Sequence, residues 1–152
     1  VNEAVGGDTA FIIPNTDTTL TIPSTSERVI TVGAYDSVNI STVGFSGRGY
    51  TRATEYIKPD LVAPGVNILT TTVGGSITSF TGTSVAAPFV AGSVALLMEW
   101  GIVDRNDIFL YGERLKAFLC NGAIRDNSRE YPNREWGYGR LCLKNTLDLL
   151  KK

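Results

Sequence analysis

The chain contains no histidine, the side chain that most often acts as a general base near neutral pH. It has two cysteines, too few for a disulfide framework in a chain of this size, and their spacing matches no zinc site. Neither sign of charge dominates, because 14 basic residues stand against 15 acidic ones. This balance gives no electrostatic footprint for nucleic acid or an anionic membrane, so we expect neither as a partner.

Long hydrophobic runs are also few. The longest, residues 85–100, has about 16 residues, fewer than the roughly 20 that span a bilayer. It is apolar nearly all round, which predicts a central buried helix. The first ten residues lack the basic start and apolar core of a signal peptide. The 152-residue length and 43% hydrophobic content fit one domain with a substantial core.

Short β-branched stretches separated by proline and glycine predict strands in the first half of the chain. Two more helices are expected after the apolar one: 107–120, capped by Asn106 or Asp107, and 144–152. Between them, the glycine-rich segment 136–143 predicts a turn into a short strand. Strands followed by a helix that they enclose indicate an α/β fold. The earlier expected strands are 11–13, 18–22, 28–36, 61–63, 66–72 (which a turn at 74–75 follows) and 76–80, while residues 40–51 are expected to be a strand that breaks into an irregular loop.

Ser84 lies where the last expected strand meets the apolar helix, and two interpretations are open. Serine is a favoured N-cap, because its oxygen accepts an orphan amide of the first helical turn. Alternatively, Gly82 permits a tight turn, and Thr83 and Ser84 then place a hydroxyl at the positive end of the helix dipole. Free amides there can stabilise a developing oxyanion, which suits acyl transfer with Ser84 as the nucleophile.

The whole string around this serine is more specific. Residues 82–92, GTSVAAPFVAG, resemble the nucleophile segment of the subtilisin family of serine proteases, Gly-Thr-Ser-x-Ala-x-Pro-x-Val-x-Gly, at every fixed position. Three further blocks agree with that family in order and spacing, and the resemblance covers about residues 23–149. It implies the C-terminal portion of a subtilisin-like, parallel-sheet, three-layer α/β fold. The three blocks are RVITVGAYD at 28–36, KPDLVAPGVNI at 58–68 and GYGRLCL at 137–143.

By this resemblance Ser84 is the nucleophile of a serine endopeptidase that forms an acyl-enzyme, with Thr83 and Gly82 in the turn that supplies the oxyanion site. The family order is Asp, His, Ser, so the aspartate, the histidine and the oxyanion asparagine are expected upstream. The chain is therefore expected to be a fragment, inactive alone, whose partner is the remaining N-terminal part of the same protease. A propeptide is a further expected partner, and the substrate is a protein or peptide.

Several strings look most like the bacterial, notably clostridial, branch, which includes proteases of spore germination. Some members carry a β-rich insert before this region, so residues 1–22 are predicted to be its tail and 23–152 the C-terminal portion of the catalytic domain. The resemblance favours a secreted or spore-associated protein. No cofactor or metal ligand is indicated, although the resemblance leaves structural calcium open in the full-length protein.

The resemblance makes Asp60 structural, and Asn15 lies too far from any Gly-Asn block to serve as the oxyanion asparagine. Phe80 and Thr81 would line the leaving-group side of the cleft, or they are simply strand residues. Two alternatives to the enzyme stay open: a catalytically inactive pseudoprotease that acts as a regulatory or binding module, and a plain α/β domain in which Ser84 caps a helix.

Overall fold

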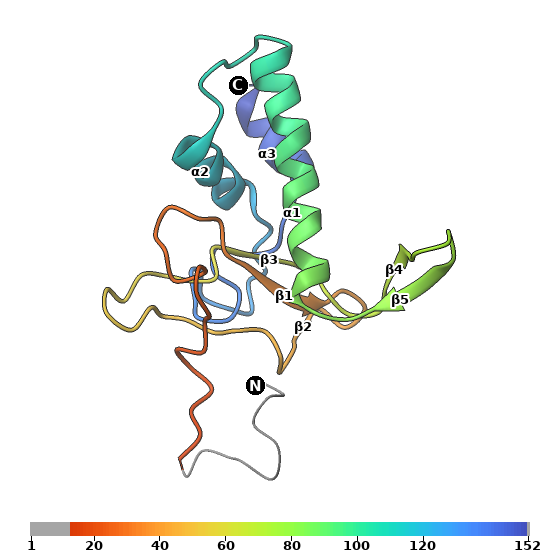
Figure 1. The fold of residues 1–152 in the computed structure, drawn as a ribbon. Helices are drawn as coiled ribbons and strands as arrows, with labels where there is room; N and C mark the ends of the chain where they lie inside the picture. Colours follow the sequence, from red (N-terminus) through yellow and green to blue (C-terminus); the bar gives the residue numbers. More distant parts are fainter. Residues whose placement is uncertain (1–12, 152) are drawn as a thin grey trace.

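The computed structural model describes residues 13–151, and its centre is a small sheet of order β2-β1-β3 (Figure 1). Strands β1 (Val32–Asp36) and β3 (Leu61–Pro64) run parallel, with Ala34 opposite Ala63. Strand β2 (Ser41–Thr42) pairs antiparallel with β1. The expected strand at 61–63 is confirmed, whereas residues 11 and 12 of the first expected strand lie outside the described residues.

The sheet is covered on both faces, as the sequence of β1 predicts. Side chains alternate along a strand, so Ala34 and Leu61 join the core beneath the helices. Tyr35 and Val62 point to the other face and pack against the buried Trp136. A sheet this small is stable only because both faces are occupied.

The helices lie together on one side of the sheet (Figure 1). Helix α1 (Thr83–Met98) packs on β1 and β3 and continues into the π-helical turn η1 (Glu99–Val103). Helix α2 (Gly112–Gly122) packs against α3 (Leu143–Leu150). This arrangement confirms the α/β class.

Strands β4 (Ile68–Thr71) and β5 (Ile77–Phe80) form a hairpin that projects from the rest of the chain (Figure 1). Gly74 and Gly75 have φ values of 91° and 81°, which glycine adopts without the steric penalty of a side chain. The predicted turn is confirmed. Every residue of β5 is exposed.

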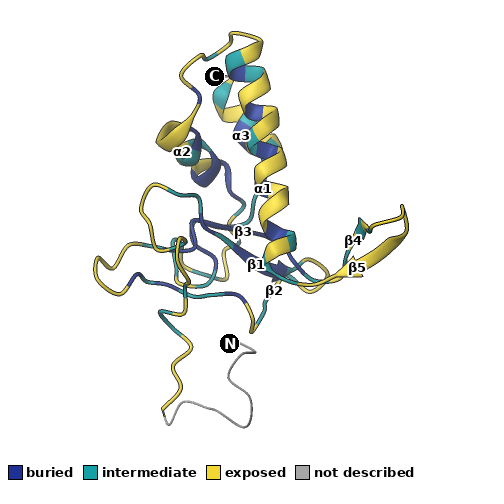
Figure 2. Cartoon of the chain, in the orientation of Figure 1, coloured by how far each residue is buried: buried dark blue, intermediate teal, exposed yellow. Residues whose placement is uncertain are grey.

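Helix α1 presents only one side to the chain, and its opposite side is exposed (Figure 2). Phe89 is 42% exposed and Leu96 is 53% exposed. The prediction of a central buried helix is therefore wrong for the described residues, because nothing in residues 13–151 covers the second apolar side. The buried side consists of Ala86, Val90, Ser93 and Leu97, spaced three or four residues apart.

The π-helical turn lengthens the apolar helix beyond the run seen in the sequence. Together α1 and η1 give one helix of 21 residues, Thr83–Val103, with a mean hydropathy of 1.6, long and apolar enough to cross a membrane. The prediction that this helix is too short to span a bilayer is thus wrong. A core helix has the same length and composition, and α1 packs on β1 and β3 as core helices do.

One stretch predicted as a strand, residues 18–22, is irregular. Residues 18–22 form no strand, because Thr18 has a φ of 58° and the Thr19 hydroxyl accepts from the Arg48 N–H at 3.0 Å. A side chain here takes the place of a backbone carbonyl, so no ladder continues. The prediction for residues 40–51 is confirmed, because the short strand β2 is followed by an irregular, glycine-containing loop.

The second half also departs from prediction at two points. Helix α2 begins at Gly112, because Asp107 accepts from the Phe109 N–H at 3.2 Å and closes a separate turn. The strand expected in 136–143 reduces to bridges at Arg140, which pairs with Val62 at the open edge of β3.

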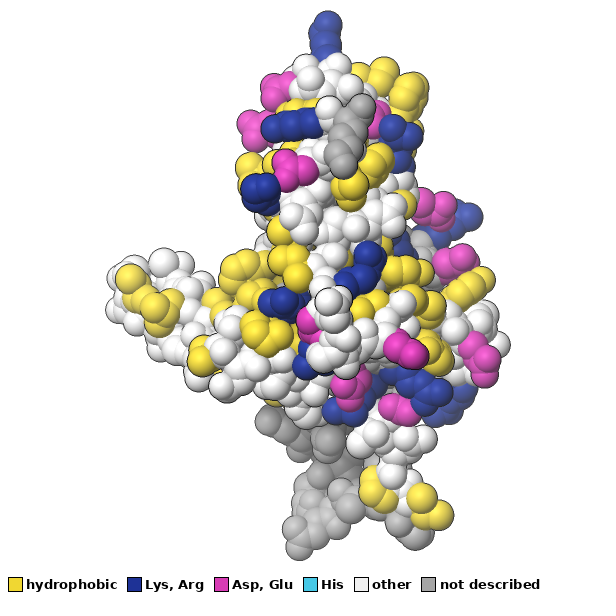
Figure 3. Space-filling view, turned by 180° about the vertical axis from the view of Figure 1, so that it is seen from behind, with side chains coloured by type: hydrophobic (Ala, Val, Ile, Leu, Met, Phe, Trp, Pro, Cys, Tyr) yellow, Lys and Arg dark blue, Asp and Glu magenta, His cyan; other side chains and the backbone are white. Residues whose placement is uncertain are grey.

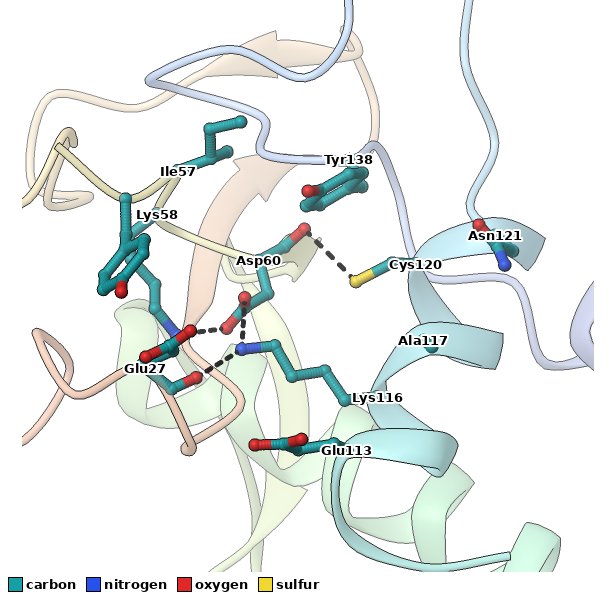
Figure 4. A pocket seen from close by; sticks show the side chains of 11 residues that line it. Glu27, Ile57, Lys58, Asp60, Glu113, Lys116, Ala117, Cys120, Asn121 and Tyr138 are labelled. Atoms are coloured by element: carbon teal, nitrogen blue, oxygen red, sulfur yellow. Dashed lines mark hydrogen bonds and ion pairs between the residues drawn. The ribbon is translucent and has the colours of Figure 1, made fainter. Parts of the chain in front are cut away.

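A buried carboxylate joins the sheet to α2 (Figure 4). Asp60, 2% exposed, accepts from the Thr31 N–H at 2.7 Å. Its carboxylate also pairs with the ammonium groups of Lys58 and Lys116, each at 2.8 Å. The two lysines reach onward to carbonyl oxygens, Lys58 to Val29 at 2.8 Å. Every charge in this cluster is therefore paired.

The cluster changes the acid–base behaviour of its members. Burial lowers the pKa of Lys58, and the charge of Asp60 offsets only part of that effect. Burial acts on Lys116 too, but its hydrogen bond to Asp60 and the carboxylate charge outweigh it and raise the pKa of Lys116. Burial, helped by Asp60, raises the pKa of Cys120 to about 11, which makes this thiol a poor nucleophile.

Charges on the surface are mixed. On the face drawn in Figure 3, basic and acidic side chains lie interspersed rather than gathered by sign. Ion pairs also join opposite charges elsewhere in the described chain, such as Arg48–Glu135 at 2.5 Å and Arg134–Asp17 at 2.5 Å.

Asp60→Asn tests the buried cluster. It leaves two ammonium groups without a counter-charge, so we expect a loss of about 3–5 kcal/mol in the free energy of unfolding, measured with urea on the protein that contains this chain. Asp104→Asn, at an exposed position, is the matched control and should change it by less than about 0.5 kcal/mol. Equal effects of the two substitutions would contradict a structural role for Asp60.

Candidate active site

The candidate site is the turn between β5 and α1. Gly82 is the residue before the first helical one, with φ 156° and ψ 163°. This region of backbone space is essentially restricted to glycine. A glycine is therefore required where the chain turns from strand to helix.

A second glycine fastens this turn to the sheet. Gly65, directly after β3, accepts from the Gly82 N–H at 2.8 Å and donates to the Tyr35 carbonyl at 3.0 Å. A Cβ on Gly65 would lie 2.6 Å from the Ala34 Cβ, so the backbones approach too closely for any side chain. The turn is thereby held at the carboxyl ends of β1 and β3, where open α/β sheets bind their ligands.

Ser84 is the second residue of α1, and its side chain is exposed. Its hydroxyl makes no hydrogen bond within residues 13–151, and the position before the helix belongs to Gly82. The interpretation of Ser84 as a helix cap is therefore wrong. The hydroxyl is free to react.

Of the four backbone N–H groups at this helix start, two have an acceptor and two do not. The Val85 and Ala86 N–H groups both donate to the Gly82 carbonyl, at 3.1 and 3.4 Å. The N–H groups of Thr83 and Ser84 have no acceptor in the described part of the chain. Free amides at the positive end of a helix dipole can stabilise an anion. The arrangement thus places the exposed Ser84 hydroxyl beside two N–H groups that have no acceptor in the described residues.

Among residues 13–151, no side chain that could act as a base is hydrogen-bonded to Ser84. The sequence has no histidine, and Asp60 is saturated by its partners in the cavity of about 450 Å³ in Figure 4, which Ser84 does not line. Asn15 lines the same cleft as Thr83, although it makes no hydrogen bond to Ser84. In the described residues, no group of three or more potential ligands could hold a metal ion.

Phe80 and Thr81 precede the turn. Phe80 is 49% exposed, and the Thr81 hydroxyl accepts from the Asn67 N–H at 2.9 Å. Thr81 therefore supports the base of the hairpin. The role of either residue on the leaving-group side stays a prediction.

One residue of interest was missed in the sequence. Phe45 lies in the loop after β2, is 48% exposed and lines a cleft that reaches Thr83. Phe45 precedes Thr83 by some 40 residues, and only the folding of its loop brings it to this cleft. No local sequence pattern could therefore predict its position.

Comparison with known proteins supports a relation to proteases. The pattern of the Subtilase family (Peptidase_S8) matches residues 3–139. The chain is similar to the serine protease AprX of Bacillus subtilis, with 31% identity over 149 residues, which cover 85% of this chain and 32% of that protein. It is also similar to the minor extracellular protease Vpr of Bacillus subtilis, with 34% identity over 116 residues, 68% of this chain and 13% of that protein.

A solved structure is similar as well. The CspB protease of Clostridium perfringens superposes with a TM-score of 0.91 at 50% identity, over 95% of this chain and 31% of that chain. The chain thus spans about a third of the length of this protease and of AprX.

Gly82→Ala tests the turn. The added Cβ is incompatible with φ 156°, so we expect a loss of about 1–3 kcal/mol in the free energy of unfolding. Gly44→Ala is the matched control, since a Cβ there meets nothing within 4 Å and φ is not positive. Urea unfolding of both variants checks this, and an unchanged midpoint for Gly82→Ala would contradict the strained turn.

Proposed function

The chain belongs to the subtilase family, and from this premise we propose that it is the C-terminal part of a serine endopeptidase whose nucleophile is Ser84. One observation carries the proposal: the Ser84 hydroxyl is exposed and unbonded at the start of α1, beside two amides without acceptors. A hydroxyl that stabilised the fold would be bonded to it.

The chemistry follows from these positions. The Ser84 oxygen attacks a peptide carbonyl, whose oxygen becomes an oxyanion and accepts hydrogen bonds from the Ser84 and Thr83 N–H groups. The amine product leaves, and water hydrolyses the acyl-enzyme. A base takes the proton of Ser84 and donates it to the departing amine nitrogen, and since the chain has no histidine we propose that this base comes from outside it.

We further propose that the upstream part of the same protease supplies the aspartate, the histidine and the oxyanion asparagine. The exposed apolar side of α1 supports this, since an uncovered apolar face of a core helix needs a partner. A propeptide is a second partner within the proposal. Substrates are proteins or peptides, and the clostridial resemblance points to spore germination as the process served.

Ser84→Ala in the protease that contains this chain tests the nucleophile. We expect peptide hydrolysis to fall by about 10⁶-fold in kcat, a magnitude known from subtilisin, itself of this family, and not an independent estimate. Ser37→Ala, at an exposed turn, is the control and should retain full activity. Hydrolysis that survives Ser84→Ala refutes the proposal. A folded protease without activity in its unsubstituted form favours the inactive regulatory module.

Ala91→Glu tests whether the upstream part covers α1. Ala91 is exposed on the open side of the helix, so in this chain alone a glutamate there is harmless. If the upstream part packs there, the charge is buried without a counter-ion, and the protease should lose several kcal/mol of stability and its activity. Asn145→Glu on the exposed side of α3 is the control. Equal stability and activity of the two variants would contradict the proposed covering.

A further inference from the structure

The face of the sheet that points away from α1 carries a cation without a counter-charge. Arg140 lies at the edge of β3, where its backbone exchanges hydrogen bonds with Ile124 at 3.0 and 2.8 Å. Its guanidinium lies 6.0 Å from the centre of the Tyr35 ring, which packs on this face. Among residues 13–151 no hydrogen bond or ion pair reaches the guanidinium, and its Nε atom is buried without an acceptor. The side chain is therefore held in place but not neutralised.

A second donor beside the same ring also lacks an acceptor. Trp136 is 1% exposed, and its ring centre lies 5.6 Å from that of Tyr35. Its indole N–H has no acceptor in the described residues. Folded proteins leave few buried donors unpaired, because each one costs free energy. The polar groups around Tyr35 are thus incompletely satisfied by this chain.

The carboxylate of this cluster is already engaged. Asp126 pairs with the Arg129 guanidinium and accepts from the Tyr131 hydroxyl at 3.2 Å. Arg129 in turn lies over the Trp136 ring, 4.6 Å from its centre. No carboxylate of residues 13–151 pairs with Arg140, so the positive charge of Arg140 stays uncompensated.

A carboxylate is the partner that fits this arginine best. The guanidinium is planar, and its parallel N–H groups match the two oxygen atoms of a carboxylate. The backbone bonds of Arg140 and the contact with Tyr35 restrict the side chain before any partner binds, which lowers the entropy cost of pairing. Arg140 is only half-buried, so a partner can still reach its charged end.

The remaining question is which molecule supplies the carboxylate. This chain spans 31% of the CspB protease chain, so most of a protease of that length lies outside it. The open side of α1 is proposed above to be covered by that upstream part. Arg140 lies on the opposite face of the sheet and offers a positive charge there. An acidic residue of the upstream part therefore complements it.

We propose that Arg140 binds a carboxylate of the upstream part of the same protease, which therefore contacts this chain on both faces of the sheet. The inference rests on the proposed function, because that function makes the upstream part the partner of this chain. Contacts on both faces fix the orientation of the sheet, and of the turn that carries Ser84, relative to the upstream part.

The test is the urea midpoint of the whole protease, measured in a Ser84→Ala background so that self-digestion does not affect it. Arg140→Gln leaves the upstream carboxylate unpaired, and we expect the midpoint to fall by about 1 M. Arg140→Lys keeps the charge but loses the parallel N–H groups, so its midpoint should lie between the two. Arg105→Gln is the matched control, since Arg105 is exposed and has no ion pair within residues 13–151, and it should leave the midpoint unchanged.

The direction of the change separates the alternatives. If Arg140 faces only water, its replacement removes an unpaired, half-buried cation, so an unchanged or raised midpoint for Arg140→Gln overturns the proposal. A crystal structure of the Ser84→Ala protease identifies the partner, and it decides if Arg140→Gln does not fold. A carboxylate of the upstream part within about 4 Å of the guanidinium supports the proposal, whereas water, a free anion or a carboxylate of this chain in that place overturns it.

These results do not depend on catalysis. The proposed function is tested by the loss of hydrolysis in Ser84→Ala, so a failure of that proposal and a failure of the Arg140 pairing are seen in different measurements.

Discussion

The buried carboxylate of Asp60 is the constraint on which the rest of the structure depends. It joins the Thr31 amide, just before β1, to the ammonium of Lys116 on α2 and to the start of β3. This fixes β1 beside β3. Gly65 follows β3 directly, and its carbonyl accepts a hydrogen bond from the N–H of Gly82 in the turn before α1. Ser84 thus owes its position to a network that it never touches. Both carboxylate oxygens of Asp60 are engaged by Thr31, Lys58 and Lys116, which accords with a structural role for this residue.

The second constraint is that α1 is apolar on two sides, of which only one is buried within the described residues. Its stripe of Ala86, Val90 and Leu97 packs on the sheet, while Phe89 and Leu96 lie open. This accounts for a helix that is apolar nearly all round in a chain that buries only one side of it. Two independent observations support the proposal that an upstream part of the same protease works with this chain. The absent histidine leaves Ser84 without a base, and the open side of α1 leaves apolar surface without a partner.

Much of this could be predicted from local sequence, and the failures have physical reasons. β3, the glycine hairpin and the apolar helix were predictable because each depends on a run of adjacent residues. The start of α2 was not, because the Asp107 side chain closes a separate turn instead of capping the helix. Nor could the pairing of Lys116 with Asp60 be seen, since it joins positions far apart. At the site, the proposed role of Ser84 came from the family resemblance. The structure then excluded the interpretation of Ser84 as a helix cap and showed that Phe45 lines the cleft that reaches Thr83.

The central claim is that Ser84 is an activated nucleophile once its upstream partner is present. The most direct measurement is mass spectrometry of the intact protease after treatment with a fluorophosphonate, which reacts with activated serines and not with ordinary ones. The account predicts one phosphonyl group, on the peptide that contains Ser84. A folded protease that takes up no label, or takes it up at a different serine, would contradict it.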